Sequence, residues 1–136
     1  MSLVSGVRFL RVVFARISRL SLPRYTEVQR GVVIGSNTRI QSHSFVCSNV
    51  SIGSHCFIGH GVHFVNDRFS TGKVEFDPAK WEFIRVGDHV IIGSNCTVLP
   101  CTIAPHVIVG AGSVVTRDLT KPGIYMGTPA RWTRSV

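Results

Sequence analysis

The chain has 136 residues, of which 44% are hydrophobic, and carries a formal net charge of +8. We interpret this length as a single domain over residues 1–136 with a modest core. The charge is uneven, because residues 1–26 hold five arginines and no acid. With no nucleic-acid-binding motif and no basic stripe, nucleic acid is not an expected partner.

Residues 3–22 are predicted to form a basic amphipathic helix that ends at Pro23. Apolar residues such as Leu10 and Phe14 share one face, and arginines share the other. We favour a cap, residues 1–26, that covers the end of the fold or a partner subunit. A membrane-surface helix and an organelle presequence are the alternatives, but no apolar run is long enough to span a membrane.

Residues 28–65 contain a repeat with a period of six. The large apolar positions are Val28, Ile34, Ile40, Val46, Ile52, Ile58 and Phe64. A smaller side chain stands two residues before each of the last six. This period matches neither a helix nor a simple hairpin, and it is typical of a β-solenoid built from hexapeptide units. Glycines such as Gly35, Gly53 and Gly59 follow the aliphatic position, where a tight corner leaves little room.

The period is lost over residues 66–85, which carry four aromatic residues with acids and bases. An irregular insertion of this length in a compact domain is usually functional or disordered. Its aromatic content argues against disorder. We therefore expect a loop that forms one wall of a binding site, against the next subunit.

The repeat resumes over residues 86–119, with one spacing shortened to five. The step from Val98 to Ile103 lacks a residue near Leu99, Pro100 and Cys101, so this corner should be tighter than its neighbours. Pro122 and Pro129 are expected to prevent any further repeat in the tail, residues 120–136.

Histidines and cysteines occupy particular positions of the repeat. His43, His55, His89 and His106 each stand three residues after an aliphatic position, which is a polar corner position in a hexapeptide solenoid. The four cysteines form no CxxC pair, and we expect them to be reduced, buried thiols of a cytoplasmic protein.

Three later segments carry a resemblance to a known family. IGSNCTV (92–98), VGAGSVVTRDL (109–119) and GTPAR (127–131) resemble the closing coils of the hexapeptide-repeat acyltransferases. FIGHGVHFVND (57–67) with AKWE (79–82) looks most like the nucleotide-sugar N-acetyltransferases within that superfamily. The resemblance covers about residues 30–134.

The resemblance implies an all-β fold, a left-handed parallel β-helix, and a homotrimer with active sites between subunits. It also implies an enzyme that transfers an acetyl group from acetyl-CoA, its co-substrate, to the 3-amino group of a dTDP- or UDP-linked amino-deoxysugar. No metal is expected.

The catalytic candidates are Asn66, Asp67 and His60. In the sugar O-acetyltransferases that this chain resembles, the equivalent of Asn66–Asp67 reads Asn-His, and the histidine is the general base. An alcohol needs its proton removed during attack, whereas an unprotonated amine is already nucleophilic. Aspartate at position 67 therefore favours an amine acceptor, unless Asn66–Asp67 only begins a turn. His60 would reach the site across subunits, or else face solvent at a corner.

The remaining candidates are cofactor and substrate residues, and all of the cofactor residues except Gly112 are carried over from the resemblance. The cofactor set is Ser94, Ala111, Gly112, Thr116, Arg117, Arg131 and Arg134. Small residues let a pantetheine arm lie close to the backbone, and arginines form bidentate contacts with phosphates. The substrate set is Phe64, Arg68 and Trp81.

Three alternatives stay open. The first is a sugar or small-alcohol O-acetyltransferase of the maltose or galactoside type, and the second is a scaffold that binds no CoA. The third is a γ-carbonic-anhydrase-like zinc protein, for which His43 lies seventeen positions before His60, nearly one coil, and His55 lies five positions before it. Spacing alone is weak evidence for a metal site.

Overall fold

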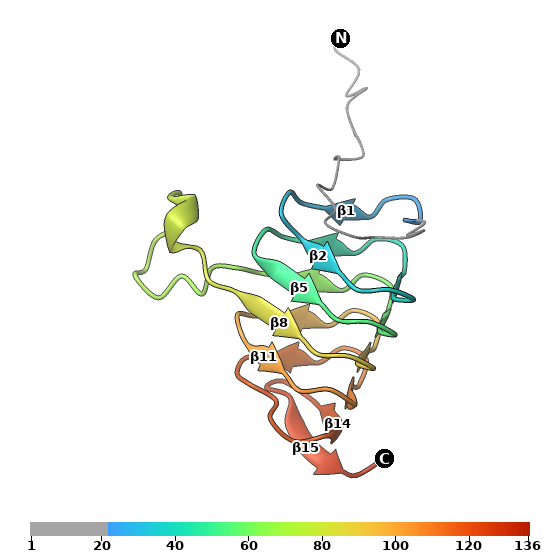
Figure 1. Ribbon diagram of the computed structural model, residues 1–136. Coiled ribbons are helices and arrows are strands. Elements are labelled where there is room, and N and C mark those ends of the chain that lie inside the picture. Colours follow the sequence, from blue (N-terminus) through green and yellow to red (C-terminus); the bar gives the residue numbers. More distant parts are fainter. Residues whose placement is uncertain (1–21) are drawn as a thin grey trace.

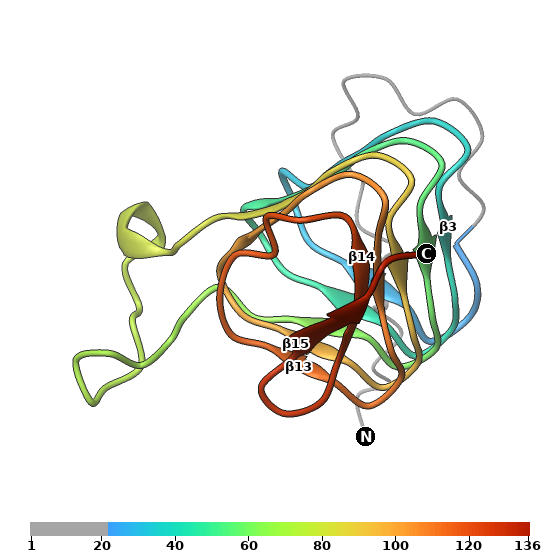
Figure 2. The same cartoon turned by 90° about the horizontal axis from the view of Figure 1, so that it is seen from below.

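Short parallel strands stacked on three sides of a prism make up the fold. The computed structural model describes residues 22–136, in which each coil visits three sheets in turn (Figure 1). Viewed along the stack, the coils have a three-cornered outline, and one segment projects from a corner (Figure 2). The all-β prediction is confirmed, and the coils are consistent with a left-handed β-helix. The helix predicted over 3–22 falls, but for its last residue, outside the described residues.

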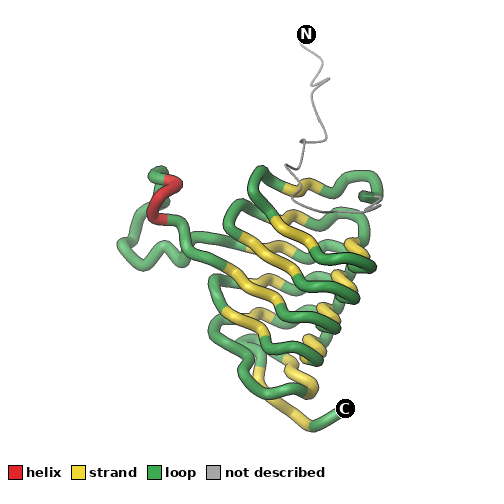
Figure 3. The backbone as a smooth tube through the Cα atoms, in the orientation of Figure 1, coloured by secondary structure: helices red, strands yellow, loops and turns green. Residues whose placement is uncertain are grey.

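The strands are two to four residues long and are separated by turns (Figure 3). Sheet A contains β1 (Glu27–Val28), β4 (Phe45–Val46), β7 (His63–Phe64), β10 (Thr97–Val98) and β13 (Val114–Val115). Sheet B contains β2 (Val33–Ile34), β5 (Val50–Ile52), β8 (Ile84–Val86) and β11 (Thr102–Ile103). Sheet C contains β3 (Arg39–Ile40), β6 (Phe57–Ile58), β9 (Ile91–Ile92), β12 (Val107–Val109), β14 (Gly123–Met126) and β15 (Arg131–Arg134).

The period-six side chains form the core, as the sequence predicts. Each strand places one residue of its pair outward and the next inward, so the aliphatic positions meet along the axis of the prism. Ile34, Ile58 and Phe64 have at most 1% of their surface exposed. The smaller partners, such as Val62 and Cys96, are also buried. One continuous apolar shaft therefore holds successive coils together.

Polar residues at the smaller inward position are satisfied by the backbone of a neighbouring coil. The Thr38 hydroxyl donates to the Gly53 carbonyl at 2.7 Å, and the Ser44 hydroxyl donates to the Gly59 carbonyl at 3.0 Å. Such bonds remove the cost of burying a hydroxyl group in an apolar shaft.

The corner glycines are required by the stacking of coils. A Cβ on Gly59 would lie 2.7 Å from the Ser94 backbone nitrogen, and a Cβ on Gly93 would lie 2.6 Å from that of Ala111. The close approach of the next coil, more than the conformational freedom of glycine, therefore explains these two residues.

The strand register measures the length of each coil. Val33 pairs with Ser51, eighteen positions later, whereas Phe57 pairs with Ile91, thirty-four positions later, because the inserted loop lies between them. Thr97 pairs with Val114, only seventeen positions later. The missing residue predicted near Leu99–Cys101 is therefore confirmed.

The inserted loop leaves the stack after β7 and returns at β8. It projects away from the prism and contains one short 3₁₀ helix, η1 (Pro78–Lys80) (Figures 1 and 3). The Asp77 carboxylate accepts the Ala79 N–H at 3.0 Å and caps this helix. β8 begins at Ile84, so Ile84 and Arg85 lie in sheet B and not in the loop where the sequence placed them.

The C-terminal segment corrects the expectation that the repeat stops after Leu119. β14 pairs in parallel with β12 and adds another strand to sheet C. β15 then turns back and pairs antiparallel with β14. Pro122 precedes β14 and Pro129 lies in the turn before β15, so neither proline interrupts a ladder.

We name the three corners of the prism by their residues. The loop corner, between sheets A and B, contains Asn49, Pro100 and the inserted loop. The histidine corner, between sheets B and C, contains His55, His89 and His106. The serine corner, between sheets C and A, contains Ser42, His60, Ser94 and Ala111.

Candidate active site

Asn66 and Asp67 begin the inserted loop, and both are half-buried. The Asn66 side-chain amide donates to the Ser48 carbonyl at 3.1 Å. The two carboxylate oxygens of Asp67 accept the backbone N–H groups of Phe69 and Glu75, each at 2.8 Å. Asp67 therefore orders both limbs of the loop, the structural role that the turn alternative anticipated.

Arg68 directs its guanidinium group back onto the protein. Nε donates to the Glu82 carboxylate at 3.3 Å, and Nη1 donates to the Thr116 carbonyl at 2.9 Å. Nη2 donates to the Pro100 carbonyl. The side chain expected to bind substrate thus has all three of its nitrogens in contacts with the protein.

The other two predicted substrate residues differ in accessibility. The Phe64 side chain is completely buried in the shaft, so its assignment to substrate binding is wrong. An inward period-six position has no access to a ligand outside the prism. Trp81 is half-buried in the loop, where its indole N–H donates to the Glu75 carbonyl at 2.7 Å. Its own carbonyl accepts the Asn49 side-chain amide at 3.1 Å.

His60 lies on the serine corner and faces solvent. Its Nδ1 is 3.1 Å from the Ser42 hydroxyl, which is also 3.1 Å from Nδ1 of His43. The His60 backbone N–H donates to the Ser94 hydroxyl at 3.2 Å. The contacts of Ser42 were not predicted, although the eighteen-residue coil places Ser42 next to His60.

Ser94, Ala111 and Gly112 continue the same corner below His60. The Gly112 N–H donates to the Ser94 carbonyl at 2.8 Å. Ala111 and Gly112 are exposed, and among residues 22–136 no atom outside Gly112 and its two chain neighbours lies within 4 Å of the position that a Gly112 Cβ would occupy. This edge therefore offers backbone and small side chains, a surface along which an extended chain can lie closely.

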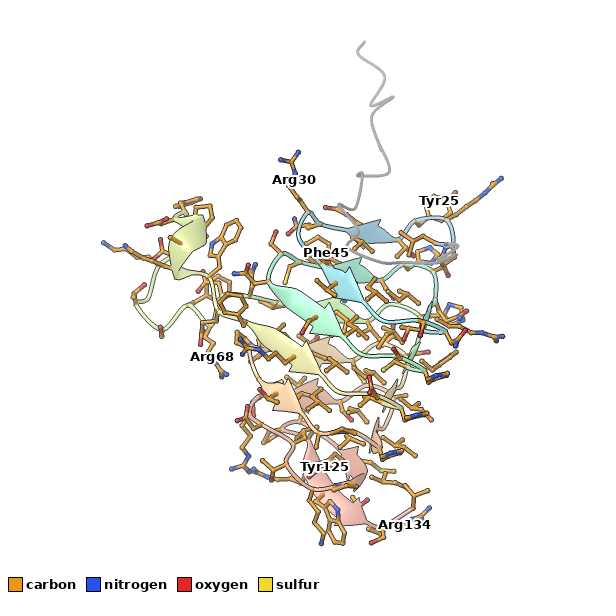
Figure 4. The ribbon with its side chains drawn as sticks, viewed as in Figure 1. Tyr25, Arg30, Phe45, Arg68, Tyr125 and Arg134 are labelled. Atoms are coloured by element: carbon orange, nitrogen blue, oxygen red, sulfur yellow. The ribbon has the colours of Figure 1, made fainter. Side chains whose placement is uncertain are left out.

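The remaining cofactor candidates lie elsewhere. Thr116 and Arg117 follow β13 at the loop corner, close to Arg68. Arg131 lies at the start of β15, opposite Met126, and Arg134 is paired with Ile124. Figure 4 shows Arg134 at the C-terminal end of the prism. One chain therefore brings His60, Ser94, Ala111 and Gly112 together and separates them from the loop-corner residues.

The predicted corner histidines are confirmed. His43, His55, His89 and His106 all have positive φ angles, between 56° and 63°. The rings of His55, His89 and His106 stack, with centroids 4.9 Å apart. A hollow of about 350 Å³ beside His89 and His106 is lined by Ile91, Ile108 and residues of the C-terminal segment. No predicted site residue lines this hollow.

The four cysteines are free and buried, as the sequence predicts. Burial raises the pKa of the Cys47 thiol to about 11, and burial with the nearby Asp118 carboxylate raises that of Cys101 to about 12. Since the thiolate is the nucleophilic form, these residues act as core side chains.

The described residues, 22–136, contain neither a metal-binding cluster nor a membrane-spanning helix. In this part of the chain, no group of three or more His, Cys, Asp and Glu side chains is arranged to hold a metal ion. The same residues contain no helix that is long and apolar enough to cross a membrane.

Two family models match the chain. The bacterial transferase hexapeptide model (six repeats) matches residues 31–66, and the hexapeptide repeat of succinyl-transferase matches residues 83–117. Together they cover just over half of the chain. The chain belongs to the hexapeptide-repeat transferase superfamily.

Individual relatives are acetyltransferases or acyltransferases. Over 79 residues, the chain is 33% identical to galactoside O-acetyltransferase of Escherichia coli K12, covering 57% of this chain and 36% of that one. A Vibrio cholerae hexapeptide-repeat acetyltransferase, solved with acetyl coenzyme A, is 28% identical with a TM-score of 0.68. That match covers 81% of this chain and 63% of that one.

One further solved structure is similar to this chain in fold alone. AntD, an N-acyltransferase from Bacillus cereus solved with dTDP and coenzyme A, has a TM-score of 0.61 over 84% of this chain and 79% of that one. Its 22% identity shows a similarity of fold alone. The chain spans 12–48% of the length of the curated relatives it matches.

Proposed function

We propose that this protein is an acetyl-CoA-dependent N-acetyltransferase that acts on the amino group of a dTDP- or UDP-linked amino-deoxysugar. Superfamily membership and the acetyl coenzyme A bound to the Vibrio cholerae relative support the donor. The exposed small residues Ala111 and Gly112 on the serine corner fit a pantetheine arm.

The contacts of Asp67 support an amine acceptor, and they carry the proposal. Both carboxylate oxygens already accept backbone N–H groups of the loop. A general base for a hydroxyl group must take a proton as the bond forms, whereas an amine requires only positioning and later loss of its proton. The edge near Asp67 is therefore better suited to an amine.

In the proposed reaction, the amine nitrogen attacks the thioester carbonyl carbon of acetyl-CoA. The C–N bond forms, the C–S bond breaks, and CoA leaves as a thiolate that takes up the proton lost by the nitrogen. A backbone N–H on the exposed coil edge would stabilise the oxyanion that develops on the carbonyl. Asn66, at the mouth of the loop, would orient the acceptor.

A second copy of the chain would complete the site. His60 and Asp67 lie at two different corners of their coil, with β7 between them. A site that uses both therefore needs the serine corner of one subunit to face the loop corner of another. A closed ring of three prisms satisfies this geometry at every interface, so we propose a homotrimer.

An O-acetyltransferase is the second candidate function. It is favoured by the similarity to galactoside O-acetyltransferase and by the contact between His60 and Ser42. If the Ser42 hydroxyl donates to His43 and accepts the Nδ1 proton of His60, Nε2 of His60 is free to act as a base.

The proposal is tested by CoA release from acetyl-CoA with paired acceptors that differ only in an amino or a hydroxyl group. We expect turnover with the amino-sugar nucleotide and little with its hydroxyl twin, the analogue that has a hydroxyl group in place of the amino group. A thermal-shift titration with CoA accompanies the assay, because a ligand that binds only the native state raises its apparent stability. A protein that neither shifts nor turns over would be a scaffold.

A further inference from the structure

The Arg68 guanidinium joins the inserted loop to two coils below it. Arg68 lies where the loop leaves the prism (Figure 4). It donates to the carbonyl of Pro100 in the next coil and to the carbonyl of Thr116 in the coil after that. No other described side chain in the loop makes a hydrogen bond to either coil.

Both carbonyls are available because the ladder is interrupted beneath them. Pro100 lies in the corner that lacks one residue, and Thr116 follows β13, the last strand of sheet A. Within residues 22–136, no backbone N–H donates to either carbonyl. A guanidinium group provides several donors in a fixed plane, so one arginine can satisfy both acceptors.

The same side chain closes the base of the loop. Its Nε contacts the carboxylate of Glu82, whose backbone N–H donates to the Asn66 carbonyl at 3.0 Å. Glu82 is near the returning end of the loop and Asn66 is at its start. Arg68 therefore links Thr116 to both ends of the inserted loop, the segment that carries Asp67.

We propose that Arg68 is a positioning residue, through which CoA bound at Thr116–Arg117 orders the loop that holds the acceptor. This inference rests on the proposed function, because it assumes that CoA contacts this corner. A ligand that fixes the Thr116 peptide favours the loop conformation in which Arg68 reaches it. By linkage, the ordered loop strengthens CoA binding by the same factor.

Hydrogen exchange measured by mass spectrometry on the full chain tests this coupling. Exchange of the amides in residues 67–83 is compared without ligand and with saturating CoA, for the natural protein, Arg68→Ala and Arg68→Lys. Isothermal titration calorimetry gives the CoA dissociation constant of each. Lys73→Ala removes another loop cation, whose side chain makes no hydrogen bond or ion pair with residues 22–136, and serves as the matched control.

In the natural protein and in Lys73→Ala, we expect CoA to slow exchange of the loop by roughly tenfold, a typical size for coupling between two sites. In Arg68→Ala the loop should exchange at the same rate with and without CoA. The CoA dissociation constant of this variant should rise by roughly tenfold, the factor by which CoA slows exchange in the natural protein. Arg68→Lys should restore part of both effects, because lysine keeps the charge but cannot span both carbonyls.

Two results would overturn the inference while leaving the proposed function intact. One is CoA binding that leaves loop exchange unchanged in the natural protein. The other is equal CoA protection of the loop in the natural protein and in Arg68→Ala. Failure of the natural protein to bind CoA would overturn both proposals.

Discussion

The Asp67 carboxylate accepts the backbone N–H of Glu75 at 2.8 Å, across the two limbs of the inserted loop. Its other oxygen accepts the N–H of Phe69 at the same distance. One side chain at the edge of the prism thus fixes the path of the segment that we assign to the acceptor site. Loss of this carboxylate should affect the loop before it affects the shaft.

Asp67→Asn should lower turnover by at least about tenfold, because an amide has one acceptor oxygen and cannot serve both N–H groups. The midpoint of thermal unfolding should change little, since the loop lies outside the core. The pH dependence of kcat separates two roles. If Asp67 only positions the loop, Asp67→Asn lowers kcat equally at every pH. If Asp67 is a base, the substitution removes the acidic limb of the pH profile. Unchanged turnover would remove Asp67 from the mechanism.

Neighbouring isoleucines of β9 provide a test of the shaft. Ile92 is fully buried, whereas Ile91 is 42% exposed on the outer face of the same strand. Ile92→Ala should lower the free energy of unfolding by about 2–5 kcal/mol, the range for deleting a buried aliphatic side chain. Ile91→Ala should cost less than about 1 kcal/mol. Denaturant unfolding of the two variants measures both, and equal costs would contradict the inward and outward assignment.

Two glycines separate the effect of coil stacking from that of glycine substitution itself. Gly93→Ala would bring a Cβ to 2.6 Å from the Ala111 backbone nitrogen, whereas the nearest atom for Gly110→Ala is Cγ of the Met126 side chain. Backbone cannot move aside, but a methionine side chain can. We expect Gly93→Ala to cost about 1–3 kcal/mol of stability. Gly110→Ala should cost clearly less, as unfolding curves will show.

The core of the prism could be predicted from the sequence, because one repeat determines many of its contacts. The burial of Ile58 and Cys56 follows from a period of six, and the short coil follows from the spacing between Val98 and Ile103. The same register contradicts a substrate role for Phe64, since inward positions cannot reach a ligand.

The contacts of the inserted loop could not be predicted from the sequence. Arg68 reaches the carbonyl of Thr116 across forty-eight positions, and this depends on the loop conformation together with a shortened corner. The sequence pointed to Asp67 as a chemical group, but its two acceptors are occupied by N–H groups that only the folded loop brings there. No periodic pattern specifies either arrangement.

Alkaline pH should destabilise the fold through its buried thiols. Burial raises the pKa of Cys47 from 9.0 to about 11 and contributes to the rise of that of Cys101 to about 12. The native state then holds these protons more tightly than the unfolded chain, so stability is fully present below pH 9 and falls as pH rises from there. Denaturant unfolding as a function of pH measures the slope. Cys101→Ala should flatten it, and an unchanged slope would contradict this origin.

Thiol labelling provides an independent check on the same residues. At neutral pH all four cysteines should resist alkylation in the native protein, because they are buried and protonated. All four should react after denaturation. Rapid labelling of Cys47 or Cys101 in the native state would show that the loop corner is open.

A competition between two acceptors tests the central claim most directly. Equal amounts of a dTDP-linked amino-deoxysugar and its hydroxyl twin are incubated with the protein and isotopically labelled acetyl-CoA, and the products are identified by mass spectrometry. The account predicts the label on the amide nitrogen of the amino sugar, in an amount that depends on the protein and falls in Asp67→Asn. Label on the hydroxyl twin alone would contradict an amine acceptor.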